Sequence, residues 1–425
     1  MISVYIKLFY FWLILLPFGY QITAYTGVIE PDKAMALVLI MIGCLVLFKD
    51  SEYRRSRVLF FMFLAVTLLM IKSISLFGSE FYAKFIWDDA NKIAYFLVPL
   101  LVINSMDVFR RAGWLVVFVA ITGCVSAFMV SMGLITLPVS VPLEYRISWL
   151  PRAKGLFLST GNLAQYIAFA MAMVIIAPGV VNKKAKYLRT VRWVFFLSIA
   201  MGLLATQSRN IFIVLLVSLF AIAGLKKAGR MNANSKAIAF VGITIGLIIP
   251  LVFVTVFYSS NIVDTVAGAG GDYAKTSVLS RFQQYSVAWD TISSNPLLGI
   301  DSETYKRAGP IVDHIHNMWL QLLTHGGLIT IIIMFSLLLR SFYGVRKMAR
   351  IPDKAEDAMV VTVYFAAMAV AVMFYIGQDK MFWTLLGVAT SLACIRSEIT
   401  VQEKKQGDDL PAAELETGYK GVRLR

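Results

Sequence analysis

All three histidines of the chain lie within one short stretch, residues 313–325. They are His314, His316 and His325, and His316 is followed by Asn317 and then by a long apolar run. Histidine can take up and return a proton near neutral pH, because the unperturbed pKa of its ring is about 6.5. His316 and Asn317 also close the longest polar loop of an otherwise apolar chain. This stretch is therefore a candidate for acid–base chemistry at a membrane surface.

Three arginines, Arg152, Arg209 and Arg281, could bind a phosphate group at the same surface. A guanidinium group binds phosphate oxygens through paired, charge-assisted hydrogen bonds, and it stabilises the charge that builds on a departing phosphate. Arg209 lies where two apolar runs meet, and an ionisable group in such a place usually faces the interior of a helix bundle. Together with a histidine that accepts the proton of an attacking hydroxyl, these arginines suit glycosyl transfer from a lipid-linked pyrophosphate donor.

The rest of the chain must hold these residues at a membrane. Of its 425 residues, 59% are apolar and only 15% are charged. Apolar runs of about 20 residues, the length that crosses a hydrocarbon core, recur from end to end. We therefore predict an all-α, polytopic integral membrane protein with about twelve transmembrane helices. The predicted spans are approximately 5–22, 33–48, 58–77, 86–104, 113–135, 161–180, 192–207, 210–225, 237–258, 317–339, 359–377 and 381–395.

Lysine and arginine gather in alternate short loops between the predicted spans. Because cytoplasmic loops of membrane proteins carry an excess of these residues, the even-numbered loops and both termini are predicted to face the cytoplasm. The odd-numbered loops, including the long ones at 136–160 and 259–316, then face outward. The net charge of +15 is explained by this pattern and not by nucleic-acid binding. The basic clusters include Lys49, Arg54, Arg55 and Arg57 in the second loop and Arg340, Arg346, Lys347, Arg350 and Lys354 in the tenth.

The predicted organisation has four parts. Residues 1–258 hold transmembrane helices one to nine with short loops, and residues 259–316 form an outer loop with an amphipathic helix. Residues 317–395 hold helices ten to twelve, and the charged tail at 396–425 is expected to be disordered in the cytoplasm. The helix in the outer loop is expected to lie against the membrane surface or to cap the bundle. Its expected apolar face consists of Leu279, Phe282, Trp289 and Ile292.

Four short motifs follow one another over roughly residues 150–330. They are Arg152-Ala-Lys-Gly-Leu-Phe-Leu-Ser-Thr-Gly-Asn162, Thr206-Gln-Ser-Arg209, Arg281 with Trp289 and Asn295-Pro-Leu-Leu-Gly299, and His316-Asn-Met-Trp-Leu-Gln321 with Gly327 beyond it. In their order, their spacing and their shared placement on the outer face, these motifs resemble the O-antigen ligase and polymerase superfamily of membrane glycosyltransferases.

The resemblance implies an O-antigen ligase, with no metal, nucleotide or other cofactor. Such enzymes move a polysaccharide from undecaprenyl pyrophosphate to the lipid A–core of lipopolysaccharide, at the periplasmic face of the bacterial inner membrane. His316 would activate the acceptor hydroxyl, while Arg209 and Arg281 would hold the pyrophosphate, so the anomeric carbon would be inverted. The family commonly has an acidic residue about where His325 stands. The substrate-binding candidates are Arg152, Lys154, Asn162, Asn317 and His314.

Some of these residues also have a purely structural interpretation. Asn317 could cap a helix, and His316 could be a polar residue at the entrance of a span. His325, beside two glycines, is expected to be a hydrogen-bonded packing histidine. Arg281 could be a solvated or headgroup-facing charge. The carboxylate pair Asp88–Asp89 is not expected to bind a metal, because adjacent residues on a helix do not share a face.

Three classes of function stay open. The first is the O-antigen ligase, and the second is a related enzyme, either an O-antigen polymerase or a protein O-oligosaccharyltransferase. The third is a transporter of lipid-linked glycans, which would place charges near the bilayer midplane and use broken helices. The predicted spans are nearly free of charge and the ionisable residues gather at one face, which favours an enzyme.

Overall fold

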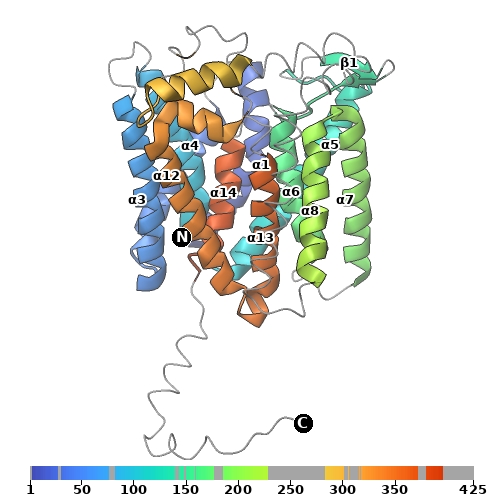
Figure 1. The fold of residues 1–425 in the computed structure, drawn as a ribbon. Coiled ribbons are helices and arrows are strands. Elements are labelled where there is room, and N and C mark those ends of the chain that lie inside the picture. Colours follow the sequence, from blue (N-terminus) through green and yellow to red (C-terminus); the bar gives the residue numbers. More distant parts are fainter. Residues whose placement is uncertain are drawn as a thin grey trace, which may run out of the picture.

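A bundle of helices makes up most of the protein (Figure 1). The computed structural model describes residues 2–26, 30–75, 82–138, 143–147, 150–157, 159–176, 185–227, 283–300, 305, 315, 317–371 and 380–395. The helices with named bounds are α1 (Ile2–Thr26), α2 (Pro31–Leu47), α3 (Glu52–Ser75), α4 (Tyr82–Val102), α5 (Met106–Ser131), α6 (Thr160–Ile176), α7 (Ala185–Thr206), α8 (Arg209–Lys227), α12 (Met318–Met348), α13 (Pro352–Ala371) and α14 (Lys380–Leu392). A further helix spans residues 283–294.

The predicted helical membrane architecture is confirmed in its general form. Among the described residues, three helices are long and apolar enough to cross a membrane, judged by length and composition. These are Ile2–Gly19 within α1, Met106–Ser131 and Met318–Met348. Shorter apolar helices cover Thr160–Ile176, Thr190–Thr206 and Ile211–Leu225. The number of twelve spans stays a prediction, and the predicted span at 237–258 and the tail at 396–425 lie outside the described residues.

The all-α prediction misses a small sheet. Strands β1 (Leu143–Ile147) and β2 (Leu150–Arg152) pair in antiparallel fashion, with Leu143 opposite Arg152. They lie in the first long loop that was predicted to face outward, where no regular structure was expected. A two-stranded sheet is too short to leave a strong periodic signal in the sequence.

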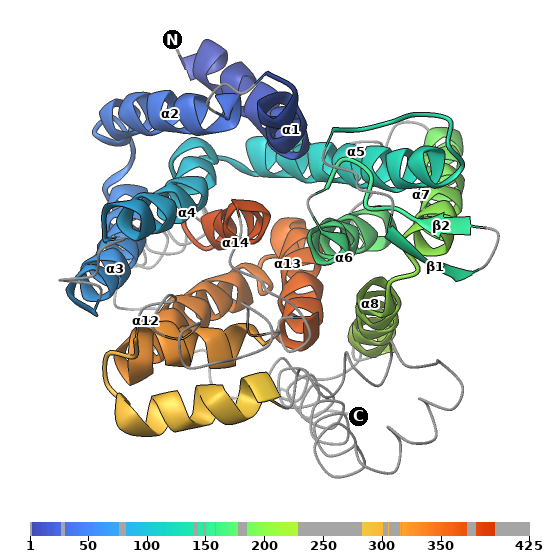
Figure 2. The same ribbon diagram turned by 90° about the horizontal axis from the view of Figure 1, so that it is seen from above.

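The centre of the bundle is formed by α6 and α14 (Figure 2). Every residue of α14 is buried, as is nearly every residue of α6. A helix that is apolar on all sides is expected in the interior of a large bundle. Small residues allow close approach between such helices: a Cβ on Gly387 of α14 would collide with the carbonyl oxygen of Phe96 in α4.

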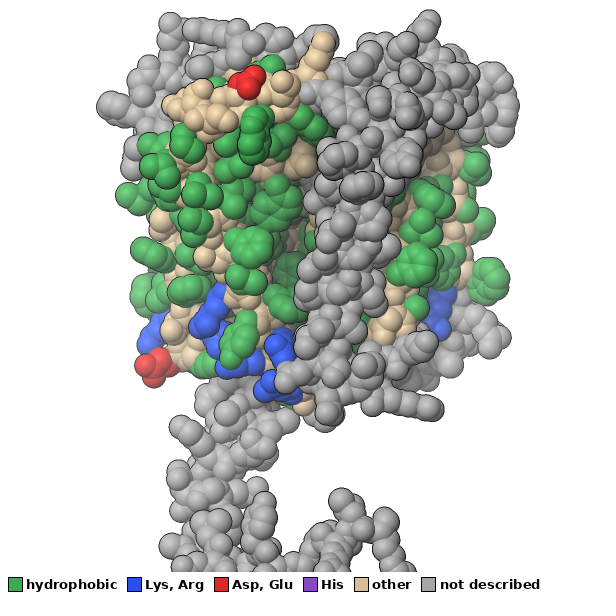
Figure 3. Space-filling view, viewed as in Figure 1, with side chains coloured by type: hydrophobic (Ala, Val, Ile, Leu, Met, Phe, Trp, Pro, Cys, Tyr) green, Lys and Arg blue, Asp and Glu red, His purple; other side chains and the backbone are tan. Residues whose placement is uncertain are grey.

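On the face seen in Figure 3, the described lysine and arginine side chains gather at one end of the bundle. Figure 3 shows a belt of exposed apolar side chains with the lysine and arginine side chains gathered along its lower rim. Strand β1 and helix 283–294 lie at the opposite, upper end (Figure 1). The two long loops that were predicted to share one face thus contribute structure at the same end of the molecule.

Several of the basic residues at the lower end have structural partners. The Nη2 group of Arg54 donates hydrogen bonds to the carbonyl oxygens of Leu100, Leu101 and Ile103 at distances of 3.0, 2.8 and 3.3 Å. These carbonyls belong to the end of α4, where a cation is favoured by the helix dipole. Arg110 of α5 donates through Nε and Nη2 to Asp357 of α13, at 2.9 and 2.8 Å. These arginines therefore also hold helices together.

A buried ion-pair network joins the first helices to the last one. The ammonium group of Lys380 lies 2.7 Å from Oδ2 of Asp32 and 2.7 Å from Oε2 of Glu30. Tyr95 of α4 donates to the same oxygen of Asp32 at 2.7 Å, and Nε1 of Trp12 in α1 donates to the backbone oxygen of Asp32 at 2.9 Å. Four helices, α1, α2, α4 and α14, meet at this network.

Candidate functional site

The structure describes some of the site residues predicted from the sequence in full, some by their backbone alone, and some not at all. Lys154, Asn162 and Asn317 are described, and the backbones of Arg152 and Arg209 are placed at the end of β2 and the start of α8. The side chains of these two arginines lie outside the described residues, and so do three whole residues of the predicted set. Those three are Arg281, His314 and His316.

The residues on either side of His316 are both anchored. Ile315 is fully buried, in contact with Ala288 and Tyr305. Asn317 has an extended backbone and caps α12, because its Oδ1 accepts a hydrogen bond from the backbone nitrogen of Leu320 at 3.1 Å. The helix-capping role that the sequence left open for Asn317 is therefore confirmed. Both sequence neighbours of His316 are therefore held by contacts with described residues.

Ile315 belongs to a second, small apolar core, which we call the outer-loop core. Its buried members are Ala288, Tyr305 and Ile315. The hydroxyl of Tyr305 donates to the backbone oxygen of Gln284 at 3.0 Å, and burial raises the pKa of Tyr305 to about 12. Its hydroxyl therefore keeps its proton, and its hydrogen bond, at neutral pH. The partly buried side chains that pack on this core are Tyr285, Val287, Ile300 and Leu320.

The turn 295–299 docks on a break in α12. Gly327 has φ 64° and ψ −171°, a conformation outside the helical region. The backbone groups released there are paired by the turn, since Leu328 N donates to Pro296 O and Ile300 N donates to Thr324 O, both at 2.8 Å. A Cβ on Gly327 would collide with the carbonyl oxygen of Leu297. The turn thereby fixes helix 283–294 against α12.

His325 has the structural role that was expected for it. Its Nδ1 lies 3.2 Å from the carbonyl oxygen of Ile300. Its ring packs edge-on against the ring of Tyr305, with 5.5 Å between centroids and an angle of 86°. The contact with the carbonyl requires the proton to be on Nδ1. His325 thus connects α12 to the outer-loop core.

Of the predicted apolar face of the outer helix, only Trp289 and Ile292 are described. Ile292 is buried, whereas Trp289 is 64% exposed. The buried side of the helix also carries Gln284, Ala288 and Thr291, at spacings of three and four residues. Trp289 points away from this face. Leu279 and Phe282, the other two predicted members, lie outside the described residues.

The segments 152–162 and 206–209, which carry the first two family-like motifs, lie close together at the upper end of the bundle, away from helix 283–294. Ala153 N donates to Ala205 O at 2.9 Å, which places the segment after β2 beside the end of α7 and the turn 206–209. Gly155 has φ 64°, and a Cβ there would lie 2.5 Å from the backbone nitrogen of Ala127 in α5. Asn162 is fully buried in the first turn of α6 and accepts from the hydroxyl of Ser159 at 3.0 Å. Figure 2 shows β1 and β2 over a different part of the bundle from helix 283–294.

Acidic residues near the start of α4 form an ordinary ion pair. Asp89 accepts from the ammonium group of Lys92 at 2.8 Å, while Asp88 is exposed. Within the described residues, no group of three or more histidine, cysteine, aspartate or glutamate side chains is arranged to hold a metal ion.

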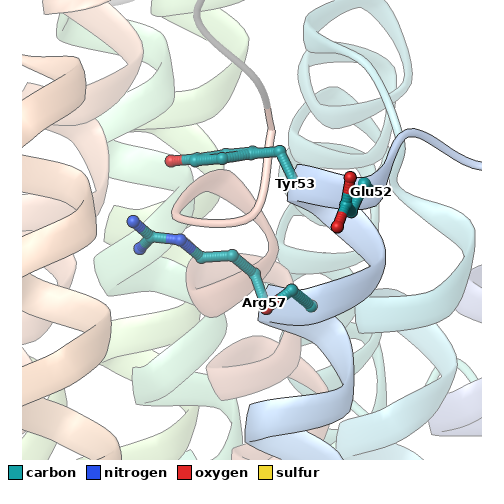
Figure 4. Close-up of a pocket in the computed structure, with 4 residues that line it drawn as sticks. Glu52, Tyr53 and Arg57 are labelled. Atoms are coloured by element: carbon teal, nitrogen blue, oxygen red, sulfur yellow. The ribbon is translucent and has the colours of Figure 1, made fainter.

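A pocket at the start of α3 lies at the opposite end from these motifs. It is lined by Glu52, Tyr53, Ser56 and Arg57 (Figure 4). The guanidinium of Arg57 lies 4.9 Å from the ring centroid of Tyr53. Phe60, one turn further along α3, packs beneath Arg340 near the end of α12. The pocket is therefore far from Asn317, which begins α12.

Comparison with curated proteins finds no match. The family model described as O-antigen ligase matches residues 193–335. That stretch includes Arg209, Arg281, His316 and the docked turn 295–299, whereas Arg152, Lys154 and Asn162 precede it. The similarity of residues 193–335 to this family supports membership of the O-antigen ligase and polymerase superfamily for this helical, apolar chain.

Proposed function

We propose that the protein is an O-antigen ligase, which transfers a polysaccharide from undecaprenyl pyrophosphate to a hydroxyl of lipid A–core. The observation that carries the proposal is the match of residues 193–335 to the O-antigen ligase family. Members of this superfamily are membrane glycosyltransferase-like enzymes. The same match therefore supports a membrane enzyme of the ligase or polymerase type.

In the proposed reaction, His316 accepts the proton of the acceptor hydroxyl while its oxygen attacks the anomeric carbon of the donor. The bond between that carbon and the pyrophosphate oxygen breaks, and undecaprenyl pyrophosphate leaves with the bonding electrons. Arg209 and Arg281 bind the pyrophosphate and stabilise its growing negative charge. Attack from the opposite side inverts the anomeric carbon. No metal or other cofactor takes part in this scheme.

The remaining predicted residues are proposed to bind substrate. Arg152 and Lys154 would contact anionic groups, and the hydrogen bond between Ala153 and Ala205 supports their placement near the turn that precedes Arg209. His314 and Asn162 complete the proposed set. For Asn317 the capping role is established by its hydrogen bond to Leu320, and a substrate contact would be additional.

We further propose that the chain crosses the bacterial inner membrane about twelve times, with both termini in the cytoplasm and the active site in the periplasm. The apolar belt and the basic rim at one end support this orientation, because cytoplasmic loops are rich in lysine and arginine (Figure 3). Membrane lipids would surround the belt. A transporter would use a broken helix to line a cavity, whereas the break at Gly327 is filled by the turn 295–299.

Transfer by the purified, reconstituted protein tests the proposal. Undecaprenyl-pyrophosphate glycan is supplied with a chelator, and lipid A–core is the only acceptor. Glycan-capped lipid A–core from the wild type and none from His316→Ala is the expected result. Arg281→Lys should also lose most activity, because a lysine cannot form the paired hydrogen bonds of a guanidinium.

The same assay separates the ligase from its relatives. No capped lipid A–core, but longer lipid-linked glycan when the donor is supplied alone, would identify an O-antigen polymerase. Transfer only to a serine or threonine of an added protein would identify a protein O-oligosaccharyltransferase. Full activity in His316→Ala would contradict the assigned base in each case.

A further inference from the structure

Gln284 carries a buried side-chain amide whose two polar atoms are unpaired. The residue is 0% exposed, and neither Nε2 nor Oε1 has a hydrogen-bond partner in the described part of the chain. A buried polar atom without a partner loses its hydration and gains nothing in return, so folded proteins contain few of them. Two such atoms on one side chain, which Gln165 of α6 also has, leave an amide able to bind a molecule from outside the protein.

Gln284 belongs to the helix whose Ala288 is part of the outer-loop core. Gln284 lies one turn before Ala288 on the buried face of helix 283–294, and its backbone oxygen accepts from Tyr305. Ala288 and Tyr305 pack on Ile315, the residue that directly precedes His316. In the sequence, Gln284 follows Arg281 by three residues. The amide therefore lies on the helix that packs on Ile315, the residue before His316 in the sequence.

A second glutamine contributes to the same region. Oε1 of Gln321 is also buried and unpaired among the described residues. Gln321 lies one turn after Asn317 in α12, and Leu320 beside it packs on the outer-loop core.

The chemistry of the amide indicates what it binds. An amide offers two hydrogens and an acceptor oxygen, whereas a pyrophosphate offers acceptors only. A pyrophosphate could therefore pair Nε2 of Gln284 but not Oε1. A sugar hydroxyl both donates and accepts, and so does an acetamido group. A sugar satisfies both atoms of the amide at once.

We propose that Gln284 is a substrate-binding residue whose amide holds a sugar of the donor glycan or of the acceptor core. The assignment rests on the proposed function, because it requires a glycan to enter the site. It adds a contact with the sugar to the predicted contacts with the pyrophosphate.

A pair of matched variants separates binding from folding. Gln284→Met keeps the length of the side chain and removes both polar atoms. Because the amide is buried without partners, this variant should melt at the wild-type temperature or above it. Ser218→Ala is the control, since Ser218 of α8 is also fully buried with an unpaired hydroxyl and lies more than two turns from the start of that helix. Only Gln284→Met should lose affinity for a sugar.

Binding is measured with three probes by the rise in melting temperature of the full-length protein in detergent. The probes are undecaprenyl-pyrophosphate glycan, lipid A–core and sugar-free undecaprenyl pyrophosphate. Gln284→Met should bind one of the two sugar-bearing probes about tenfold more weakly or worse, and the probe affected identifies the source of the sugar. Its affinity for sugar-free undecaprenyl pyrophosphate should not change.

The outcomes that overturn the assignment differ from those that overturn the proposed function. If the wild type binds the sugar-bearing probes and Gln284→Met binds them equally well, the assignment to Gln284 is wrong and the ligase proposal stands. A lower melting temperature with unchanged affinities would assign Gln284 a structural role instead. Weaker binding of the sugar-free probe would point to the pyrophosphate and contradict the sugar contact. A wild type that binds no sugar-bearing probe overturns both proposals.

Discussion

Gly299 and Gly327 lie against each other where the outer-loop turn meets the break in α12. Both have positive φ, 68° and 64°, and a Cβ on Gly299 would lie 2.9 Å from the backbone nitrogen of Gly327. This contact connects helix 283–294, which follows Arg281, to α12, which begins directly after Asn317. The relative position of helix 283–294 and α12 therefore depends on two glycines.

Gly327→Ala should destabilise the protein and reduce transfer. The strained backbone alone costs about 1–3 kcal/mol, and the collision with the Leu297 carbonyl adds to it. Gly133→Ala is a matched control, because Gly133 also has positive φ, 71°, but nothing lies within 4 Å of a Cβ there. The melting temperature of Gly327→Ala should fall further than that of Gly133→Ala. Equal losses would mean that the close contact between turn and helix is unimportant.

Asn317→Ala should lower the free energy of unfolding by about 1 kcal/mol, because it removes the cap on Leu320 N. Asn317→Ser restores a capping oxygen and should recover the melting temperature. Transfer activity measured on both variants then separates two roles of Asn317. If capping is its whole contribution, activity returns with Asn317→Ser. If Asn317 also binds substrate, stability returns and activity does not.

His325→Ala should lower the melting temperature by several degrees, because it removes both the hydrogen bond to Ile300 and the ring contact with Tyr305. Assays well below that temperature should show substantial transfer. His316→Ala should show the opposite pattern, with wild-type melting and no transfer. A chemically essential His325 would be revealed by complete loss of transfer at every temperature.

Lys380→Met should be strongly destabilising, by about 3–5 kcal/mol, because it leaves Asp32 buried without its cation. Lys33→Met is the control, since Lys33 is 25% exposed and pairs only with Glu30, at 3.2 Å. Such a pair contributes less than about 1 kcal/mol. Thermal unfolding of the two variants in detergent measures the difference. Similar melting temperatures would show that the buried network contributes little.

Stability should also fall in acid through Glu30. Burial alone would raise its pKa, but the ammonium groups of Lys380 and Lys33 outweigh this effect and hold the pKa of Glu30 below its usual value of 4.5. The stabilisation from Glu30 is then present above that value and is lost as the pH falls through the lowered folded-state pKa. Melting temperatures between pH 3 and pH 7 should fall less steeply below about pH 4.5 in Glu30→Gln than in the wild type. Parallel curves would contradict the prediction.

Two structural roles near the candidate site could be predicted from the sequence because their signals are local. The capping role of Asn317 followed from an asparagine directly before an apolar run, and the packing role of His325 from its place beside Gly326 and Gly327. The glutamine at 284 gave no such signal, since a glutamine on a helix is exposed in most proteins. Its importance depends on burial, which is a property of the folded molecule.

The helical, membrane-type character of the chain and the alternation of basic loops were determined by the sequence by itself. Apolar runs and charged loops act through their own contact with lipid or water, so composition is enough to recognise them. The tertiary structure alone decided which distant residues meet, such as Asp32 with Lys380, 348 positions away. It also decided that Ile292 is buried while Trp289 is exposed. Such outcomes depend on the surfaces that pack against each element, and a local pattern does not contain them.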